Sequence, residues 1–281
     1  MKLQQLAAIG PWDWPEDAST ILRQALRDKQ AAEEDRVLAA ELAGEIPTSD
    51  EPLTDALMAT IADAADSDEL RARAAIALGP LLEYMDTEVE DDTEYAELPI
   101  SPEKFEELRV FLRKMHRDAN VPTDVRRAAL EAAVRSPQDW HPAAIRAAYA
   151  SGDAKWRLTA VFCMAYVKGF EDEILASLDS DDLDIKRNAV NAAGNWEIPD
   201  AWPEIDALLA ADRDTPKPLL LAAIRASTGV RPDLAPESLE PFMDDSDEDI
   251  EEAVGDAMAM VEGAAFLDAE YGDEDGEDDE N

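Results

Sequence analysis

A short phrase recurs along this chain, and its recurrence limits the possible folds more than any other feature of the sequence. The clear copies are "ELRARAAIALG" (69–79), "DVRRAALEAAV" (124–134), "KWRLTAVFCMA" (155–165) and "DIKRNAVNAAG" (184–194), with looser copies at 35–44, 218–227 and 250–259. Each clear copy has an apolar residue, then Arg or Lys, then a small residue three positions further on. A period of about 30 to 35 residues is typical of stacked structural repeats.

A second helical pattern precedes most copies and supplies its own start signal. It reads "WPEDASTILRQAL" from 14, "SPEKFEELRVFL" from 101, "WHPAAIRAAY" from 140 and "WPEIDALLAA" from 202. Proline is tolerated in the first turn of a helix because the amides there lack an intrahelical partner. Each unit therefore reads as two helices joined by a short turn. We predict an all-α fold, an α-solenoid of about seven such repeats.

The units cover residues 1–262 as one array, with two departures. An acidic insertion at 86–100 interrupts the period between the second and third units, and it is too polar to be buried. The end, 263–281, closes on "EYGDEDGEDDEN", a charged segment with glycines that we expect to be disordered.

The second helix of each unit places apolar residues at its positions one, five, eight and twelve, which form one helix face. In the copy at 184–194 these positions hold Ile185, Ala189 and Ala192. The repeated basic residue at position two has two interpretations, a binding row or a structural contact to an Asp or a carbonyl of the adjacent repeat. We predict the structural role for Arg71, Arg126, Arg157 and Lys186, with Arg36 as a looser copy.

The repeated unit resembles the HEAT repeat, especially a short bacterial form whose second helix begins D-x-x-V-R-x-x-A. The matching segments are "DELRARAAIALG" (68–79), "TDVRRAALEAA" (123–133) and "LDIKRNAVNAAG" (183–194). The resemblance implies the solenoid fold and no single function, because this family is defined by its scaffold. Phycobilin lyases share the repeat type. Deoxyhypusine hydroxylase, another helical-repeat enzyme, holds iron with repeated His-Glu pairs.

Few residues suit catalysis or metal binding. Neither His116 nor His141 is followed by Glu, which excludes the His-Glu iron site. Cys163 falls on the apolar face and reads as a buried thiol rather than a nucleophile. The carboxylates around 245–249 are spaced like a calcium loop, but Ile250 stands where the loop needs Gly. We predict no catalytic residue, no cofactor and no metal, and hence no enzyme.

The charge is extreme and unevenly placed. The chain has 66 acidic and 25 basic residues, a formal net charge of −41, and 21 of the acids lie in 232–281 where no Lys or Arg occurs. Such a charge disfavours nucleic acid and anionic membranes and favours a basic partner, although a salt-adapted or high-GC proteome accounts for it as readily. One cysteine, no secretory leader and no long apolar run indicate a cytoplasmic, soluble protein.

The most specific prediction concerns the face of the second helices opposite the core. If positions one, five, eight and twelve are buried, positions three, seven and eleven line the concave groove. These positions give three rows: Arg127, Glu131 and Arg135; Leu158, Phe162 and Tyr166; Arg187, Asn191 and Asn195. An aromatic row between polar rows is typical of a recognition surface. The alternative is that Leu158, Phe162 and Tyr166 are covered by a neighbouring helix.

These observations favour a monomeric, non-catalytic scaffold that binds another protein on its concave face. A second hypothesis makes the acidic C-terminal repeat and tail a capture module for a basic protein, in the manner of a nucleic-acid mimic. A third is a lyase-type protein that handles a pigment or another small molecule.

Overall fold

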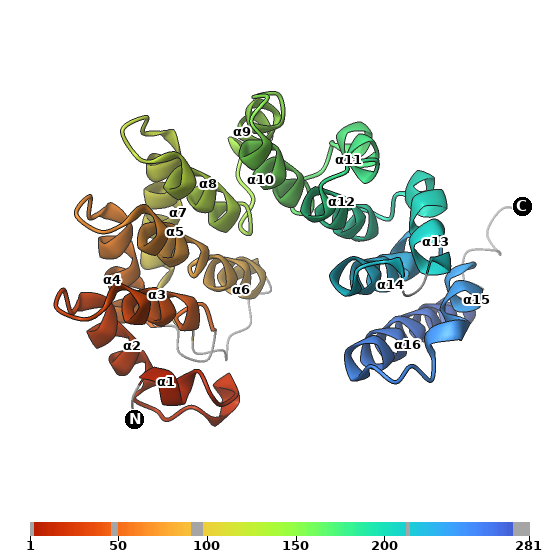
Figure 1. The fold of residues 1–281 in the computed structure, drawn as a ribbon, viewed down its shortest axis with the longest axis horizontal. Helices are drawn as coiled ribbons and strands as arrows, with labels where there is room; N and C mark the ends of the chain where they lie inside the picture. The colour runs from red at the N-terminus through yellow and green to blue at the C-terminus, as the bar shows by residue number, and fades with distance from the viewer. Residues whose placement is uncertain (1–2, 46–49, 91–97, 212–213, 272–281) are drawn as a thin grey trace, which may run out of the picture. The chain divides into compact units, whose positions relative to one another are not determined.

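The computed structural model of this chain describes residues 3–45, 50–90, 98–211 and 214–271, and these residues form helices and turns without any strand (Figure 1). The predicted all-α, α-solenoid class is therefore confirmed. The α-helices are α1 (Leu3–Leu6), α2 (Ala18–Arg27), α3 (Glu33–Leu42), α4 (Glu51–Ala62), α5 (Asp68–Ile76), α6 (Gly79–Glu90), α7 (Pro102–Arg117), α8 (Thr123–Ala133), α9 (His141–Tyr149), α10 (Ala154–Met164), α11 (Glu171–Leu178), α12 (Leu183–Asn195), α13 (Trp202–Ala210), α14 (Lys217–Val230), α15 (Ala235–Leu239) and α16 (Glu248–Tyr271). Short 3₁₀ turns lie at Pro11–Asp13, Pro199–Ala201 and Glu240–Phe242.

Within the described residues the chain runs through seven successive helix pairs, from α2 with α3 to α15 with α16. Packing groups the chain into two compact units, residues 1–144 and 145–281, with the boundary inside α9. In the first unit the second helices α3, α5 and α8 stack on one another in that order. In the second unit the stack is α10, α12, α14 and α16. The single array over 1–262 stays a prediction, and each unit is described by itself.

The expected core register is present in the second helices. Val125, Ala129, Ile185 and Ala189 are all buried, and so is Cys163, as its place on the apolar face predicts. The exceptions lie at the ends of the copies. Trp156 in the first turn of α10 is half-buried, and so are Val167 and Trp196 at position twelve, which follow the ends of α10 and α12.

The repeated basic residue has the predicted structural role, with a different carbonyl partner. In three units the arginine Nε donates to a backbone carbonyl ten residues earlier, where the first helix of the same unit ends. These hydrogen bonds run from Arg36 to Leu26 (3.0 Å), from Arg71 to Ile61 (2.9 Å) and from Arg126 to His116 (2.9 Å). The arginine thus satisfies a carbonyl that the helix end leaves unpaired. The expectation of a carbonyl in the adjacent repeat was wrong.

The last two basic positions depart from this pattern. The guanidinium of Arg157 lies 5.2 Å from the centre of the Tyr149 ring, and its Nη2 is 3.5 Å from the Tyr149 hydroxyl. Lys186 donates to a carboxylate oxygen of Glu204 on α13, at 2.7 Å. Both residues still tie the second helix of a unit to a neighbouring helix.

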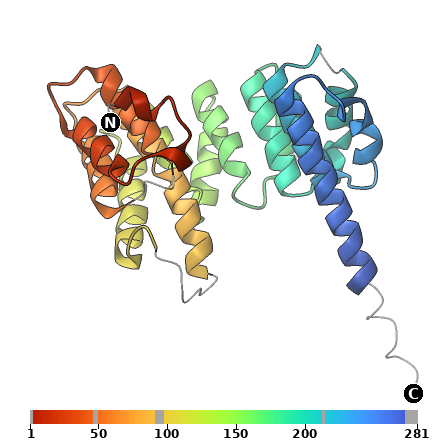
Figure 2. The same ribbon diagram turned by 90° about the horizontal axis from the view of Figure 1, so that it is seen from below.

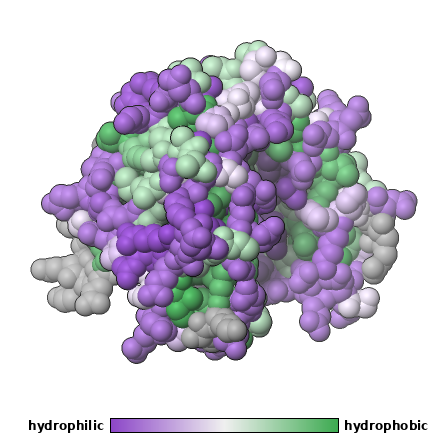
Figure 3. Space-filling model, turned by 60° about the vertical axis from the view of Figure 1, so that its left-hand side comes forward, coloured by the Kyte–Doolittle hydropathy of each residue, from purple (hydrophilic) through white to green (hydrophobic). Residues whose placement is uncertain are grey.

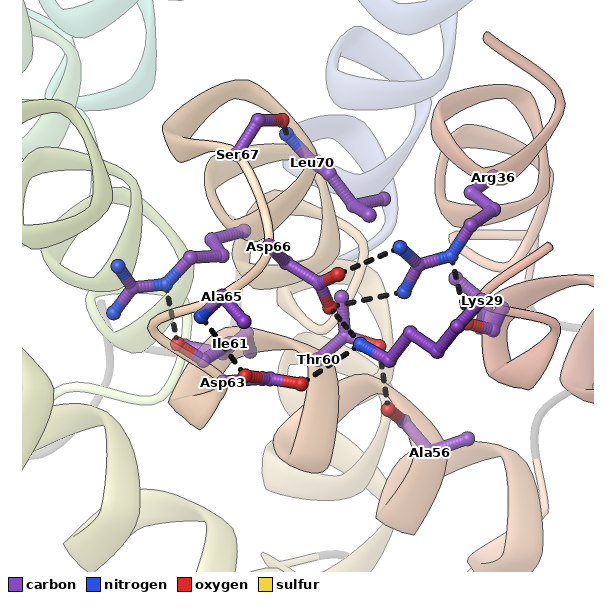
Figure 4. Close-up of polar contacts among 12 residues, drawn as sticks. Lys29, Arg36, Ala56, Thr60, Ile61, Asp63, Ala65, Asp66, Ser67 and Leu70 are labelled. Carbon is purple, nitrogen blue, oxygen red and sulfur yellow. Dashed lines mark hydrogen bonds and ion pairs between the residues drawn. The ribbon is translucent and has the colours of Figure 1, made fainter. Parts of the chain in front are cut away.

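Arg36 adds a buried ion pair to its carbonyl contact (Figure 4). Its two Nη atoms donate to the two carboxylate oxygens of Asp66 at 2.6 and 2.9 Å, and Lys29 reaches the same carboxylate at 2.6 Å. The Arg36 guanidinium holds the pKa of Asp66 below its usual range, because its hydrogen bonds favour the charged carboxylate. Asp66 precedes α5, so this contact does join adjacent repeats, as predicted for an Asp.

Two predicted boundaries need correction. The acidic insertion was expected from residue 86, but α6 continues to Glu90, and Asp86 accepts a hydrogen bond from the Ser136 hydroxyl at 2.6 Å. The segment 91–97 lies outside the described residues. The tail was expected from 263, but α16 continues to Tyr271 and extends beyond the other helices of its unit (Figure 2). The last ten residues also lie outside the description.

Hydrophilic residues cover most of the face shown in Figure 3, with separate apolar patches between them. None of the helices in the described ranges combines the length and the apolar character that a membrane crossing requires.

Candidate functional site

A groove of about 520 Å³ lies on the second unit along the stack of α10, α12, α14 and α16. Its lining follows the repeat register. Positions seven and eleven, counted from Trp156, Ile185, Leu219 and Ile250 as position one, supply Phe162 and Tyr166, Asn191 and Asn195, Arg225 and Gly229, and Met260. The lining is completed by Asn188, by Glu197 just past α12, and by the small residues Ala165, Gly194, Ala226 and Thr228.

The groove brings together four of the nine residues predicted for partner binding: Phe162, Tyr166, Asn191 and Asn195. Leu158 is half-buried and does not line it. Arg187 forms an ion pair with Asp184, one turn earlier on the same helix, at 3.0 Å.

The remaining three predicted residues lie on α8 and just after it, in the first unit, and form ion pairs there. Arg127 contacts Asp124 at 3.2 Å and Glu131 at 3.7 Å. Arg135 pairs with Glu83 of α6. All three side chains are half-buried. Their charges are therefore compensated within the chain, so they present less unpaired charge to a ligand than a free basic row would.

The floor of the groove depends on two glycines where α12 and α14 approach closely. A Cβ atom on Gly229 would lie 2.6 Å from the carbonyl oxygen of Gly194, and one on Gly194 would lie 2.8 Å from the Cα of Ala226. No side chain fits at such distances from backbone atoms. The two glycines therefore allow the helices to approach until only backbone and a methyl group line this part of the groove.

The aromatic side of the groove consists of Phe162 and Tyr166, one turn apart at the end of α10. Their ring centroids are 5.5 Å apart with an angle of 46° between the planes, a favourable tilted arrangement. Both side chains are half-buried. Each ring is therefore partly covered and still contributes surface to the groove, and its role in recognition stays a prediction.

The polar side comes mainly from three amides of α12. Asn195 donates from Nδ2 to the carbonyl of Ala165 at 3.3 Å, which ties the end of α12 to the end of α10. The side chains of Asn188 and Asn191 form no hydrogen bond with another described residue, although both line the groove. Each carries a donor and an acceptor available to a ligand.

Two charged residues complete the lining, Arg225 on α14 and Glu197 just past α12. Both are exposed, and within the described ranges neither side chain forms an ion pair or a hydrogen bond. Glu197 has a φ of 51° and is the one described residue other than glycine with a positive φ. It ends α12 where the amide of Ile198 bonds the carbonyl of Ala193 at 3.0 Å, a helix end at which glycine is usual.

The other residues singled out by sequence do not form a site. His116 and His141 both lie against the Trp140 ring, at centroid distances of 5.4 and 4.0 Å. His141 is fully buried, and burial lowers its pKa to about 3, so its ring is neutral. Among the residues whose positions are described, no three His, Cys, Asp or Glu side chains come together as they would to hold a metal ion.

The carboxylates with calcium-like spacing are occupied by an internal cation. The ammonium of Lys217 contacts both carboxylate oxygens of Asp247, at 2.6 and 2.7 Å, and one oxygen of Asp249 at 2.6 Å. These contacts lower the pKa of Asp247. A lysine from α14 therefore lies where a bound ion would have to be.

The fold and the groove place this chain in the class of helical-repeat proteins. This chain is similar to human deoxyhypusine hydroxylase, with 16% identity over 93% of this chain and 88% of that one at a TM-score of 0.42. It is also similar to two engineered proteins: one at 15% identity over 88% of this chain and 68% of that one (TM-score 0.42), the other at 16% over 89% and 98% (TM-score 0.35). No family model and no curated protein matches the sequence.

Proposed function

We propose that this chain is a non-catalytic scaffold of HEAT-like repeats that binds an extended segment of another protein in the groove of its second unit. The observation that carries the proposal is the shared register of the lining. Three successive second helices present positions seven and eleven to one groove, and the fourth, α16, adds Met260 at position eleven. The side chains there include an aromatic pair and an amide, Asn191, with unused hydrogen-bonding capacity.

An extended polypeptide matches this chemistry. A peptide bond offers one donor and one acceptor, the same pair that the amides of Asn188 and Asn191 provide. A side chain of the bound segment can pack on the edge of the Phe162–Tyr166 pair, where aromatic residues supply contact area at low entropic cost. A volume of about 520 Å³ is in the range of ligand-binding clefts.

A groove-filling substitution on the full chain tests the proposal. Asn191→Trp adds bulk inside the groove at an exposed position, and Leu183→Trp adds the same side chain to the same helix at an exposed position outside the lining. Random twelve-residue peptides displayed on phage are selected on the wild-type chain. We expect the selected peptides to bind the Leu183→Trp variant normally and the Asn191→Trp variant at least about tenfold more weakly, a change of about 1.4 kcal/mol. Equal binding to both variants would overturn the proposed function.

The acidic end of the chain supports a second candidate, electrostatic capture of a basic protein. Residues 232–281 carry 21 acids and no Lys or Arg, and the first turn of α16 contributes Glu248, Asp249 and Glu251. Binding through this region should be nearly abolished by salt at about 1 M, where the Debye length is about 3 Å. Binding in the groove, with its apolar and amide contacts, should persist at that concentration.

A further inference from the structure

The groove holds two opposite charges that the chain leaves uncompensated. Arg225 and Glu197 both line it, both are exposed, and neither is paired with the other or with any further described residue. Many basic residues of the described chain pair with carboxylates, as Lys104, Arg135 and Lys217 do, and others, such as Arg23 and Arg27, do not. What distinguishes Arg225 and Glu197 is their place, because they are the one basic and the one acidic residue of the groove lining.

The backbone conformation of Glu197 is a second reason to assign this residue a role in binding. An L-residue in the left-handed region is less stable than in the right-handed one because its Cβ crowds the following carbonyl oxygen, a clash that glycine avoids. The other described residues with positive φ are glycines, Gly152 and Gly169. Position 197 keeps a strained glutamate with its carboxylate at the groove, and no contact within the described chain accounts for that choice. Strain of this kind concentrates at functional sites.

We infer that the groove selects a segment carrying a basic and an acidic side chain, with the basic group bound by Glu197 and the acidic group by Arg225. This inference rests on the proposed function and adds the specificity to it. The groove lining itself is neutral, with one charge of each sign. The unit around it is strongly acidic, with 35 acidic and 10 basic residues in 145–281, a net charge of −25.

The negative charge of the surrounding unit affects the basic and the acidic residue of a bound segment differently. A field of this sign attracts the basic residue of a segment over a distance and repels its acidic residue. Arg225 compensates the repulsion at one point, so the acidic residue is tolerated there and disfavoured elsewhere along the groove. The two contacts together fix the direction in which a segment lies, because reversing it would bring each charge against its like.

Peptide selection with two matched variants tests the inference. Glu197→Gln removes one charge and Arg225→Gln removes the other, each at an exposed side chain with no described partner, so the fold is preserved. Peptides selected on the wild type should be enriched in one basic and one acidic residue at a fixed spacing. Selection on Glu197→Gln should lose the basic preference alone, and selection on Arg225→Gln the acidic preference alone. Each variant is the control for the other.

Exchanging the charges of Glu197 and of the basic residue of the peptide tests their contact directly. A wild-type-selected peptide should bind Glu197→Gln about two- to fivefold more weakly, the range of an exposed ion pair. It should bind Glu197→Lys more weakly still, and changing the basic residue of the peptide to Glu should restore binding to Glu197→Lys. Groove-dependent peptides without charge preference, or without restoration by the exchange, would overturn this inference and leave the proposed function intact. Peptides insensitive to Asn191→Trp would overturn both.

Discussion

The buried pair of Arg36 and Asp66 offers a quantitative test of how the repeats are joined. Replacing Arg36 by Met keeps most of the side-chain volume and removes three contacts: two to the carboxylate of Asp66 and one to the carbonyl of Leu26. Arg36 is 6% exposed and Asp66 is 9% exposed, so water cannot replace the lost donors freely. Breaking a buried pair by removing one partner typically costs about 3–5 kcal/mol.

Arg71→Met is the matched control, because it removes an arginine at the same position of the next unit. Arg71 is equally buried and bonds the carbonyl of Ile61, but its nearest carboxylate, on the exposed Asp68, is 3.8 Å away. Its loss strands one buried carbonyl, which costs about 1–3 kcal/mol. The difference between the two variants therefore isolates the stranded carboxylate of Asp66. Lys29 keeps its own contact with Asp66 and holds the Arg36→Met cost toward the lower end of its range.

The assay is urea unfolding of each full-length variant, with hydrogen exchange of amides in α3 and α5 to locate the loss. Arg36→Met should cost more than Arg71→Met, and adding Asp66→Asn to Arg36→Met should recover about 1 kcal/mol or more by removing the stranded charge. Equal costs for the two arginines, or no recovery in the double variant, would refute the argument that a buried carboxylate sets the difference.

Three further predictions concern the described side chains. Glu197→Gly should raise the free energy of unfolding by up to about 1 kcal/mol, measured by urea unfolding. Glycine adopts the left-handed conformation without steric cost, and the larger entropy of the unfolded glycine variant offsets part of that gain. A lower free energy of unfolding would contradict the strain. Gly229→Ala should destabilise the second unit, since its Cβ would meet the Gly194 carbonyl at 2.6 Å, and exchange of α12 and α14 amides should accelerate; Gly255→Ala, with open space around it, is the control. The pKa of His141 is depressed from 6.5 to about 3, so between these pH values the unfolded chain binds a proton that the folded chain does not. The free energy of unfolding should therefore fall as pH falls below about 6.5. His141→Asn should reduce the slope of the free energy of unfolding against pH by about 1.4 kcal/mol per pH unit, and an unchanged slope would contradict this prediction.

Much of the groove could be predicted from the sequence because the core register is regular. Buried positions one, five and eight fix the rotation of each second helix, and positions seven and eleven then follow by geometry. The prediction stopped at α12 because the later copies lack the basic residue that marks the phrase. Their core register survives, with Leu219 and Ile250 buried at position one. Carried two units further, the same rule would have found Arg225 and Met260.

Other features could not be predicted in this way. The position of Glu197 depends on how α12 ends, and the nearby glycine, Gly194, lies inside the helix rather than at the left-handed position. The continuation of α6 through residues 86–90 was missed because the acids there suggest a loop, whereas Leu82 and Met85 of the preceding turns are buried and anchor the helix. In the case of α6, tertiary contact overrode a local signal.

The different roles of the repeated positions explain why so acidic a chain has a nearly neutral groove. In the second unit the bases at position two contact neighbouring helices, Arg157 at the Tyr149 ring and Lys186 at the Glu204 carboxylate, and neither lines the groove. The residues at positions seven and eleven that line the groove are rings, amides, a glycine, Met260 and a single cation, Arg225. The excess acid lies in large part at the C-terminal end, beyond Arg231. A segment that carries both signs of charge can therefore be drawn in by the long-range field and still be sorted by local contacts, which a uniformly acidic surface could not do.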